Sequence, residues 1–508
     1  MDVSDSFADR PIPSVTEAEI EAFEHEEAEQ HAYELRCAER ARAEDEWVDA
    51  AVRDTPSRPP SSAVASAAAP EDATWEAALA PQGLTLLRRD RVQRGVKTMR
   101  KFAPGEVVLR ATAAAMTLTN ESSTTHCHHC VRPSGELMRC SACGFARYSS
   151  AANQRAAWAS HKHECAMLKR TRPRVPGPTV RMLIRLLNLI DNDDGHATPR
   201  APETAAAWAA GLGGVRSLHA HLESLPPSRA SELQNQAAML CGLQAEVYPS
   251  RAAPSVDLAT SLLGVLSCNA HTICDDELQP IGLGLYPLAA LTNHDCEPNC
   301  VQTFEAGALV LRAIRPISCH EEVTIAYVDV LAASPATRRA ALAGGYHFQC
   351  ACARCMREAP HEARLHSLAT RLTRAREATL AAIDGQRWDE ALEASARCCQ
   401  LCDDLLLPPD GSITTNVTAF AAGGAGEPAS PLPSASLAAL PSVSIERVRH
   451  AKLLAHANRL SEAADEWARA LVALRCSHGE GADLVRSVGD DLAGAQADRV
   501  ASAVTRTM

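Results

Sequence analysis

Cysteine and histidine residues at short, regular spacings constrain the fold of this chain more than any other feature of its sequence. The chain contains 19 cysteines. The clustered residues are Cys127-x-x-Cys130, Cys140-x-x-Cys143, His161-x-x-x-Cys165 and Cys350-x-Cys352-x-x-Cys355. A Cys-x-x-Cys turn presents two thiolates at the separation that a tetrahedral zinc ion needs. The spacings therefore predict structural zinc sites.

The first zinc site can be completed from neighbouring residues. Its four predicted ligands are Cys140, Cys143, His161 and Cys165. Cys127 and Cys130 are left without a second pair of cysteines. A further ion there would need a substitute ligand from the nearby histidines His126, His128 and His129.

The second zinc site has three ligands in one segment, namely Cys350, Cys352 and Cys355. A fourth ligand must come from elsewhere in the chain. Cys296 is the first candidate, and Cys300 competes with it.

The sequence context favours metal ligands over disulfides. The first thirty residues are acidic and do not form a signal peptide, and no run of eighteen apolar residues is present. We therefore expect no membrane segment and a cytoplasmic or nuclear location, where thiols stay reduced. Cys399-x-x-Cys402 lies on a predicted helix without partner ligands, and we expect two buried thiols there rather than a metal site.

The net charge is concentrated at the N-terminus. The chain has 508 residues and a formal charge of −12, and residues 1–54 hold 17 acidic residues against 5 arginines. The remainder is neutral overall. This balance disfavours a basic nucleic-acid-binding protein, and we expect no sequence-specific nucleic-acid binding.

The pattern of apolar residues predicts an α+β chain. Short strands are expected near 84–119 and 281–330, with a turn at Ala306–Gly307, and helices are expected over most of 178–280 and after 360. Arg387–Ala391 and Arg459–Ala463 form a weak repeat before apolar helical runs, which favours stacked helix pairs of the tetratricopeptide kind or a plain helical bundle.

The first cluster, followed by Gln154, Trp158 and Lys162, resembles a MYND zinc finger. This family holds two zinc ions in an interleaved pattern, which implies two more cysteines near Ser149 and Asn153. Both are missing. The resemblance therefore implies one intact and one degenerate site in the finger. With the second cluster, two zinc ions per chain are expected, and three if Cys127 and Cys130 find substitute ligands.

Motifs on both sides of the finger resemble a SET domain. They are Arg94-Gly95-Val96, Pro104-Gly105-Glu106, Gly282-Leu283-Gly284-Leu285-Tyr286-Pro287, Asn293-His294-Asp295-Cys296-Glu297-Pro298-Asn299-Cys300, Glu321 to Tyr327, and the Cys350 cluster, which resembles a post-SET segment. This order of motifs is that of the SET-and-MYND family of protein-lysine methyltransferases.

The resemblance implies a mostly β SET core with an inserted MYND-type finger, followed by a helical, tetratricopeptide-like C-terminal domain. The predicted parts are an acidic extension and linker, helical or disordered (1–80), the first part of the SET domain (81–125), the partly degenerate finger (126–165), a helical insertion (166–280), the SET core with the post-SET segment (281–357), and the helical domain (358–508) with a low-complexity insert (408–443).

The resemblance also implies roles for single residues. Tyr327 is the implied catalytic residue. The implied S-adenosylmethionine-binding residues are Gly95, Asn269, Asn293, His294 and Phe348, and the implied substrate-channel residues are Tyr286 and Tyr346. Three residues depart from the family pattern: Gln93 and His320 stand where glycine is usual, and Asp295 stands where serine is usual.

Lysine methylation has simple chemical needs. The methyl donor already carries a good leaving group, so the protein mainly aligns the amine, the methyl carbon and the sulfur. The lysine amine must also arrive neutral, although its free pKa is about 10.4, and an apolar channel helps by desolvation.

Two functions are compatible with these residues. The first is an S-adenosylmethionine-dependent methyltransferase acting on histone or non-histone lysines, with zinc as a structural ion and expected to be a monomer. The second is a SET-like scaffold with little activity that binds protein partners through its finger and helical domain.

Overall fold

The computed structural model describes residues 71–88, 94–194, 205–407 and 434–507. By its internal contacts the chain divides into residues 1–65 and 66–508, and all described residues belong to the second unit. Three sequence features lie outside the described residues: the acidic extension, Gln93, and residues 408–433 of the low-complexity insert.

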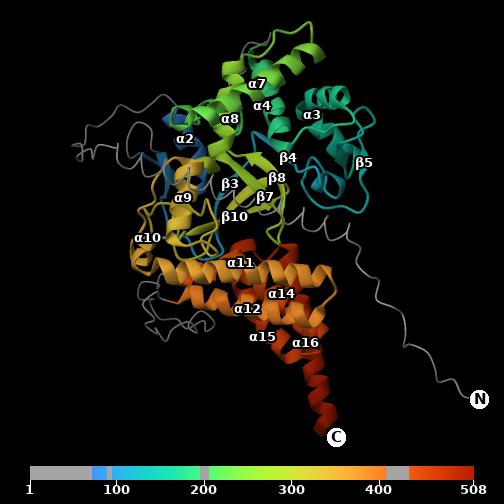
Figure 1. Ribbon diagram of the computed structural model, residues 1–508, viewed down its shortest axis with the longest axis vertical. Coiled ribbons are helices and arrows are strands. Elements are labelled where there is room, and N and C mark those ends of the chain that lie inside the picture. The colour runs from blue at the N-terminus through green and yellow to red at the C-terminus, as the bar shows by residue number, and fades with distance from the viewer. Residues whose placement is uncertain (1–70, 89–93, 195–204, 408–433, 508) are drawn as a thin grey trace, which may run out of the picture. The chain divides into compact units, whose positions relative to one another are not determined.

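Small sheets, rather than one large sheet, form the β part of the structure (Figure 1). Their orders are β1-β2, β10-β11-β3, β12-β9, β4-β8-β7 and β5-β6, and only the β12-β9 pair is parallel. The strands are β1 (Leu84–Arg88), β2 (Arg94–Thr98), β3 (Val107–Ala111), β4 (Ala115–Leu118), β5 (Met138–Arg139), β6 (Arg147–Tyr148), β7 (Ala270–Cys274), β8 (Pro280–Leu285), β9 (Asn293–His294), β10 (Cys300–Glu305), β11 (Ala308–Ala313) and β12 (Thr324–Ile325).

The turn between β10 and β11 is the one that the sequence predicts. Ala306 has φ of 51° and Gly307 has φ of 85°, and Glu305 pairs with Ala308 across the turn. Positive φ at both central residues gives the turn the twist that a two-residue hairpin needs. The hairpin carries β11 into the middle of its sheet.

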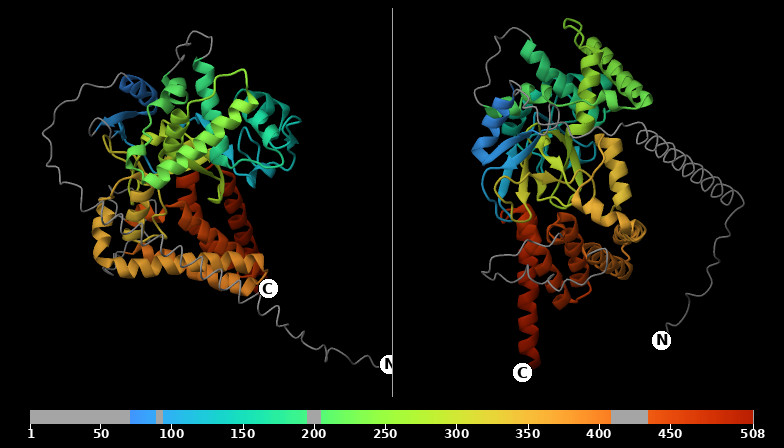
Figure 2. Two further views of the ribbon diagram at one scale, coloured as in Figure 1. Left: turned by 45° about the horizontal axis from the view of Figure 1, so that its top comes forward. Right: turned by 90° about the vertical axis from the view of Figure 1, so that its left-hand side faces the viewer.

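The helix α2 (Asp72–Leu79) packs onto the β core, which the sequence analysis did not predict. Trp75 and Leu79 are fully buried in the same apolar cluster as Leu84 of β1. Figure 2 shows α2, in blue, beside the first strands. The structure thus differs from the predicted boundary at residue 80, because the apolar face of α2 is part of the β core.

Helices fill the segment between β6 and β7. They are α3 (Ala151–Thr171), α4 (Pro178–Asp194), α5 (Ala205–Ala209), α6 (Leu212–Arg216), α7 (Pro227–Val247) and α8 (Val256–Asn269). The buried face of α4 packs with α8 and with Leu285 of β8 in one apolar cluster. The strand β7 follows α8 directly and was not predicted, since residues up to 280 were expected to be mostly helical.

Helices also make up the C-terminal part, as predicted. They are α9 (Pro335–Tyr346), α10 (Ala353–Glu358), α11 (Glu362–Asp384), α12 (Trp388–Leu406), α13 (Ser434–Ala438), α14 (Pro441–His456), α15 (Leu460–His478) and α16 (Asp483–Thr507). The predicted insert 408–443 is too long at its C-terminal end, because α13 and the start of α14 lie within it and bury Leu437 and Val443. Cys399 and Cys402 are buried on α12, as expected.

The weak sequence repeat corresponds to two equivalent helix–helix turns. Arg387 stands at the N-cap position of α12 and Arg459 at that of α15, and each guanidinium bonds a glutamate three residues later. The residue before each arginine is left-handed, with φ of 54° at Gln386 and 59° at Asn458. The repeat therefore marks two similar antiparallel helix pairs, α11–α12 and α14–α15.

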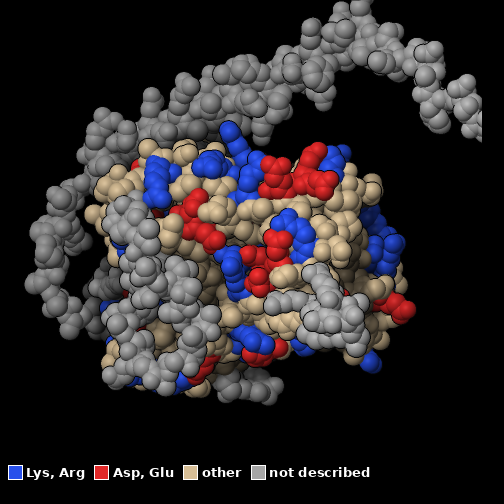
Figure 3. Space-filling view, turned by 90° about the horizontal axis from the view of Figure 1, so that it is seen from below, with Lys and Arg blue, Asp and Glu red and all other residues tan. Residues whose placement is uncertain are grey.

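The C-terminal helices contact the β core through α15 and the loop between β7 and β8. The His478 imidazole Nε2 lies 3.1 Å from the Asp276 carbonyl oxygen, and α15 touches both β10 and β11. On the face seen in Figure 3, Lys and Arg lie interspersed with Asp and Glu. Within the described ranges, no helix combines the length and the apolarity that crossing a membrane requires.

We predict that Trp75→Ala lowers the free energy of unfolding by about 3–5 kcal/mol, because it empties a fully buried site in the β core. Chemical denaturation measures the change. Trp158→Ala is the matched control, since Trp158 is 47% exposed on α3 and should change stability by less than about 1 kcal/mol. Equal effects of the two substitutions would contradict the packing of α2 onto the core.

Candidate active site and metal centres

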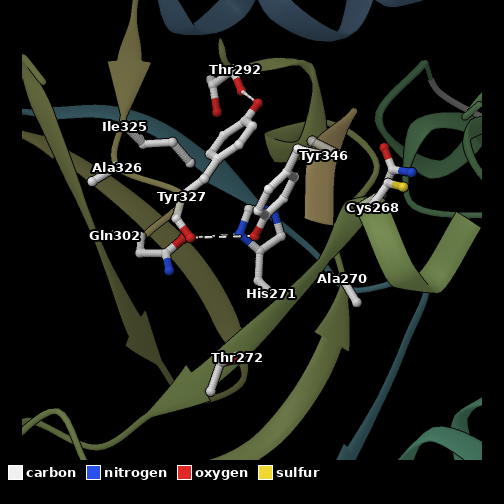
Figure 4. Close-up of a pocket in the computed structure, with 12 residues that line it drawn as sticks. Cys268, Ala270, His271, Thr272, Thr292, Gln302, Ile325, Ala326, Tyr327 and Tyr346 are labelled. Atoms are coloured by element: carbon white, nitrogen blue, oxygen red, sulfur yellow. Dashed lines mark hydrogen bonds between the residues drawn. The ribbon is translucent and has the colours of Figure 1, made fainter. Parts of the chain in front are cut away.

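A pocket of about 200 Å³ opens where β7, β10, β12 and the end of α8 meet (Figure 4). Polar and apolar side chains both line it. The lining residues are Cys268, Asn269, Ala270, His271, Thr272, Ala290, Thr292, Gln302, Ile325, Ala326, Tyr327 and Tyr346.

Tyr327 is fixed at the pocket by both its backbone and its hydroxyl. The hydroxyl donates to the Thr292 carbonyl oxygen at 2.6 Å, and the backbone N–H donates to His294 Nδ1 at 3.1 Å. The ring lies 4.7 Å from the ring of Tyr346. Burial raises the pKa of Tyr327, so the hydroxyl stays protonated at neutral pH and keeps its lone pairs for a ligand.

Asn293 holds together the segments predicted to bind the cofactor. Its Nδ2 donates to the Arg94 carbonyl oxygen at 3.1 Å and to Glu322 Oε1 at 2.8 Å. The parallel pairing of β9 with β12 sets Asn293 opposite Thr324. A Cβ on Gly95 would lie 2.7 Å from Asn293 Nδ2, so only glycine leaves room for this contact.

His294 links this loop to the second cysteine cluster. Its Nδ1 accepts from Tyr327, so the ring proton lies on Nε2, which is 3.2 Å from Cys296 Sγ. Burial lowers the pKa of His294 to about 4. The ring of Phe348, which is 36% exposed, lies 6.1 Å from the His294 ring. An exposed aromatic ring beside this loop fits the stacking of a flat base.

Asn269 ends α8 and lines the pocket. Its Nδ2 donates to the carbonyl oxygens of Val265 at 2.9 Å and His219 at 3.1 Å. The structure thus brings Asn269, Tyr327 and Tyr346 to one pocket.

Tyr286 lies elsewhere, which corrects its implied role in the substrate channel. Its side chain is fully buried in the β core, and its hydroxyl donates to the Gly307 carbonyl oxygen at 2.9 Å. It is not among the residues that line the pocket. Its ring instead packs edge-on against His271, with the centroids 5.9 Å apart, so Tyr286 supports the pocket wall from behind.

Four cysteines meet at the second cluster. The sulfur atoms of Cys296, Cys350, Cys352 and Cys355 all lie within 4.8 Å of one another. Cys296 Sγ is 3.9 Å from Cys350 Sγ and 3.5 Å from Cys355 Sγ. Zinc–sulfur bonds of about 2.3 Å give tetrahedral edges of about 3.8 Å, so the donor set fits zinc. Cys300, the competing candidate, is buried on β10 and is not part of the cluster.

The finger gathers the other predicted ligand set, Cys140, Cys143, His161 and Cys165, also within 4.8 Å. Glu164 Oε2 lies 3.1 Å from His161 Nδ1, which leaves Nε2 toward Cys143 at 3.6 Å. A carboxylate on the outer nitrogen is the usual way to orient a zinc-binding imidazole. The donor set and the orientation of His161 both fit zinc.

Glu164 also anchors the finger to α4. It is fully buried and accepts from Arg185 at 2.6 Å. Burial by itself would raise the pKa of Glu164, but Arg185 and His161 hold it well below its usual range. Arg185 also donates to the Met116 carbonyl oxygen of β4. The ligand histidine is thereby connected through one carboxylate to the β core.

Cys127 and Cys130 face an amide where a metal-binding finger would have further thiolates. Asn153 Nδ2 lies 3.6 Å from Cys127 Sγ, 3.7 Å from Cys130 Sγ and 2.9 Å from Ser149 Oγ. Among the described residues, only the two four-ligand groups bring at least three ligand atoms together. The amide N–H groups thus occupy the position between the two sulfur atoms.

Two of the family departures can be located. His320 keeps a left-handed backbone, with φ of 66°, and its N–H donates to the Thr98 carbonyl oxygen at 2.8 Å, so the turn does not need glycine. Asp295 Oδ1 accepts the Glu297 N–H at 2.8 Å, and burial raises the Asp295 pKa to about 6.

Sequence reasoning missed three polar residues of these sites. His271 and Gln302 line the pocket, and Glu164 orients His161. Glu164 could have been found, because it stands three residues after His161 on one helix face. His271 and Gln302 come together only through the strand packing.

Comparisons with known proteins identify the domain. The family model described as "SET domain" matches residues 93–328. Histone-lysine N-methyltransferase SMYD3 of Mus musculus is 35% identical over 264 residues, covering 51% of this chain and 58% of the relative. Histone-lysine N-methyltransferase ASHR1 of Arabidopsis thaliana is 34% identical over 267 residues, covering 52% of each chain.

A third relative, N-lysine methyltransferase SMYD2-A of Danio rerio, is 30% identical over 275 residues, covering 54% of this chain and 60% of the relative. The match therefore spans between about half and three fifths of these relatives. The SET domain of LSMT bound to lysine and AdoHcy aligns at 13% identity, covering 77% of this chain and 92% of that chain, with a TM-score of 0.30, too low to support an argument about the fold. The predicted resemblance to the SET-and-MYND family and the predicted fold class are confirmed.

We predict two zinc ions per purified chain, and Glu164→Gln should weaken the finger site about 10–100-fold, because it removes the charge that orients His161. Metal analysis during chelator titration measures both. The matched control is Glu246→Gln, since Glu246 is 60% exposed and pairs with an arginine away from the ligands.

A different number of zinc ions per chain would change the assignment of the ligands. Three ions would mean that Cys127 and Cys130 bind metal despite Asn153. One ion or none would contradict the assignment of the two clusters.

Proposed function

Since residues 93–328 form a SET domain and the chain is similar to lysine N-methyltransferases, we propose that it transfers methyl groups from S-adenosylmethionine to lysine side chains of histones or other proteins. The observation that carries the proposal is the pocket in which Tyr327 and Tyr346 stand beside the Asn293–His294 loop.

The proposed cofactor site is the surface formed by Gly95, Asn293, His294 and Phe348, with Asn269 at its border with the pocket. The tight contact of Gly95 with Asn293 and the exposed ring of Phe348 support this assignment. S-adenosylmethionine would supply the methyl group on a sulfonium centre, and the protein residues hold the amine in line with it.

Tyr327 is proposed to orient the amine of the substrate lysine. Because its hydroxyl proton is given to the Thr292 carbonyl oxygen, its lone pairs can accept an N–H of the neutral amine. Its raised pKa makes it a poor candidate for a phenolate base at neutral pH. The role is therefore alignment rather than proton removal.

The remaining partners are also part of the proposal. Structural zinc fits both four-ligand clusters. A protein substrate would enter at the pocket, and the finger or the C-terminal helices could contact other proteins. A monomer in the cytoplasm or nucleus remains our prediction for the state in the cell.

We predict that Tyr327→Phe lowers turnover about tenfold or more, or changes the number of methyl groups added, while S-adenosylmethionine affinity stays nearly unchanged. The lost oxygen acts on the aligned amine and not on cofactor binding. Radiolabelled methyl transfer to core histones and to cell-extract proteins measures turnover.

Tyr248→Phe is the matched control, because the Tyr248 hydroxyl bonds the His163 carbonyl oxygen outside the site. An active wild type with an equally active Tyr327→Phe would remove Tyr327 from the mechanism. A wild type that neither transfers methyl groups nor binds S-adenosylmethionine would favour the scaffold function instead.

We also predict that Asn293→Ala weakens S-adenosylmethionine binding by about 1–3 kcal/mol, since it leaves the Arg94 carbonyl and Glu322 without their shared donor. Calorimetry measures the affinity. Asn120→Ala is the control, because Asn120 accepts from Arg181 away from the pocket. Unchanged affinity in folded Asn293→Ala would exclude this loop from the cofactor site.

A further inference from the structure

Two half-buried polar side chains face each other on the wall of the pocket that also carries Tyr327 and Tyr346. His271 stands on β7 and Gln302 on β10, and His271 Nδ1 lies 2.9 Å from Gln302 Oε1 (Figure 4). Both residues line the pocket, among alanines and isoleucine on the neighbouring wall. Nothing in the lysine-transfer chemistry described above uses this pair.

The imidazole is held in one orientation. Its ring packs edge-on against Tyr286, whose hydroxyl is fixed by the Gly307 carbonyl oxygen. His271 pairs across the sheet with Gly284, and a Cβ there would lie 2.4 Å from the Tyr286 ring. The glycine therefore leaves the space in which the supporting tyrosine sits.

The pair offers a hydrogen-bond acceptor without a positive charge. Burial lowers the pKa of His271, so the ring is neutral at pH 7. With the Gln302 carbonyl oxygen toward Nδ1, the ring proton lies on Nδ1 and the Nε2 lone pair is left as an acceptor. A neutral acceptor can receive an N–H from an amine, but it gains nothing from a methyl group.

We propose that the His271–Gln302 pair limits methylation to one methyl group. Tyr327 and His271 each accept one N–H of a neutral primary amine, whereas monomethyl-lysine has one N–H left and cannot satisfy both acceptors, so the main product is monomethyl-lysine. This inference rests on the proposed methyltransferase function. Each transfer forms a bond from the neutral lysine nitrogen to the methyl carbon and breaks the sulfur–methyl bond, whose electron pair stays on sulfur. The ammonium formed must release one proton before a second transfer.

The second methyl transfer is slower because it leaves the acceptor on His271 without a hydrogen-bond donor. A methyl group placed against the acceptor displaces the water or N–H that satisfied it, which lowers the rate of the next transfer on the order of tenfold. Replacing both partners by apolar groups of similar shape removes that cost and is nearly neutral for stability.

The first test compares the wild type with the double variant His271→Phe/Gln302→Leu, as full-length zinc-loaded proteins acting on core histones. Mass spectrometry measures the ratio of mono-, di- and trimethyl-lysine. We expect mostly monomethyl-lysine from the wild type. In the double variant, the rate of second transfer relative to first transfer should rise about tenfold.

Thr303→Val is the matched control. Thr303 follows Gln302 on β10 and points to the other face of the strand, so the product ratio should not change. A wild type that makes mainly trimethyl-lysine, or an unchanged ratio in the double variant, would overturn the proposal.

A binding series separates this inference from the proposed function. Butylamine and N,N-dimethylbutylamine mimic the lysine side chain, and NMR titration measures their affinity without turnover. The wild type should bind butylamine about tenfold more tightly, and the double variant should lose this preference. A wild type that neither transfers methyl groups nor binds S-adenosylmethionine would refute the proposed function, while equal affinities of the two amines for the wild type would refute the role of the pair.

Discussion

The geometry of the pocket depends on Cys296, because this residue connects the Asn293–His294 loop to the second cysteine cluster. It stands in the loop that carries Asn293 and His294, and it also completes the cluster of Cys350, Cys352 and Cys355. Phe348 and Tyr346 lie just before this cluster, so joining the two segments brings their rings beside His294 and Tyr327. The buried Arg354 strengthens the join by donating to the carbonyl oxygens of Cys296 and Val330, both at 2.8 Å.

The finger is attached to the core by ion pairs of a buried glutamate, Glu164, rather than by a shared cysteine ligand. Glu164 pairs with the buried guanidinium groups of both Arg185 and Arg181 while it orients His161. A buried charge of this kind is stable only when it is paired and hydrogen-bonded. The degenerate half of the finger has no such requirement, because the Asn153 amide supplies neutral donors to Cys127 and Cys130.

Local patterns were the part of this structure that the sequence predicted well. Cys-x-x-Cys spacing fixes two ligands by short-range geometry, and the strands near Leu84, Val107 and Ala308 have clear apolar runs. The spacing of the cysteines could not show whether Cys296 or Cys300 is the fourth ligand. Cys300 is excluded because it is buried on β10, away from the cluster, which only the three-dimensional structure shows. The helix α2 and the strand β7 were missed, since α2 is defined by the docking of Trp75 and β7 carries the polar residues His271 and Thr272. Tyr286 was misplaced because its motif does not show which way the ring turns.

The most direct measurement of this account is the affinity of S-adenosylmethionine for Cys355→Ser, which disrupts the cluster containing Cys296, compared with Cys143→Ser, which disrupts the finger. If the Cys296 cluster holds the cofactor loop against Phe348, calorimetry should show that Cys355→Ser loses affinity about tenfold or more. Cys143→Ser should bind nearly as well as the wild type. Unchanged affinity in folded Cys355→Ser, or an equal loss in both variants, would contradict the account.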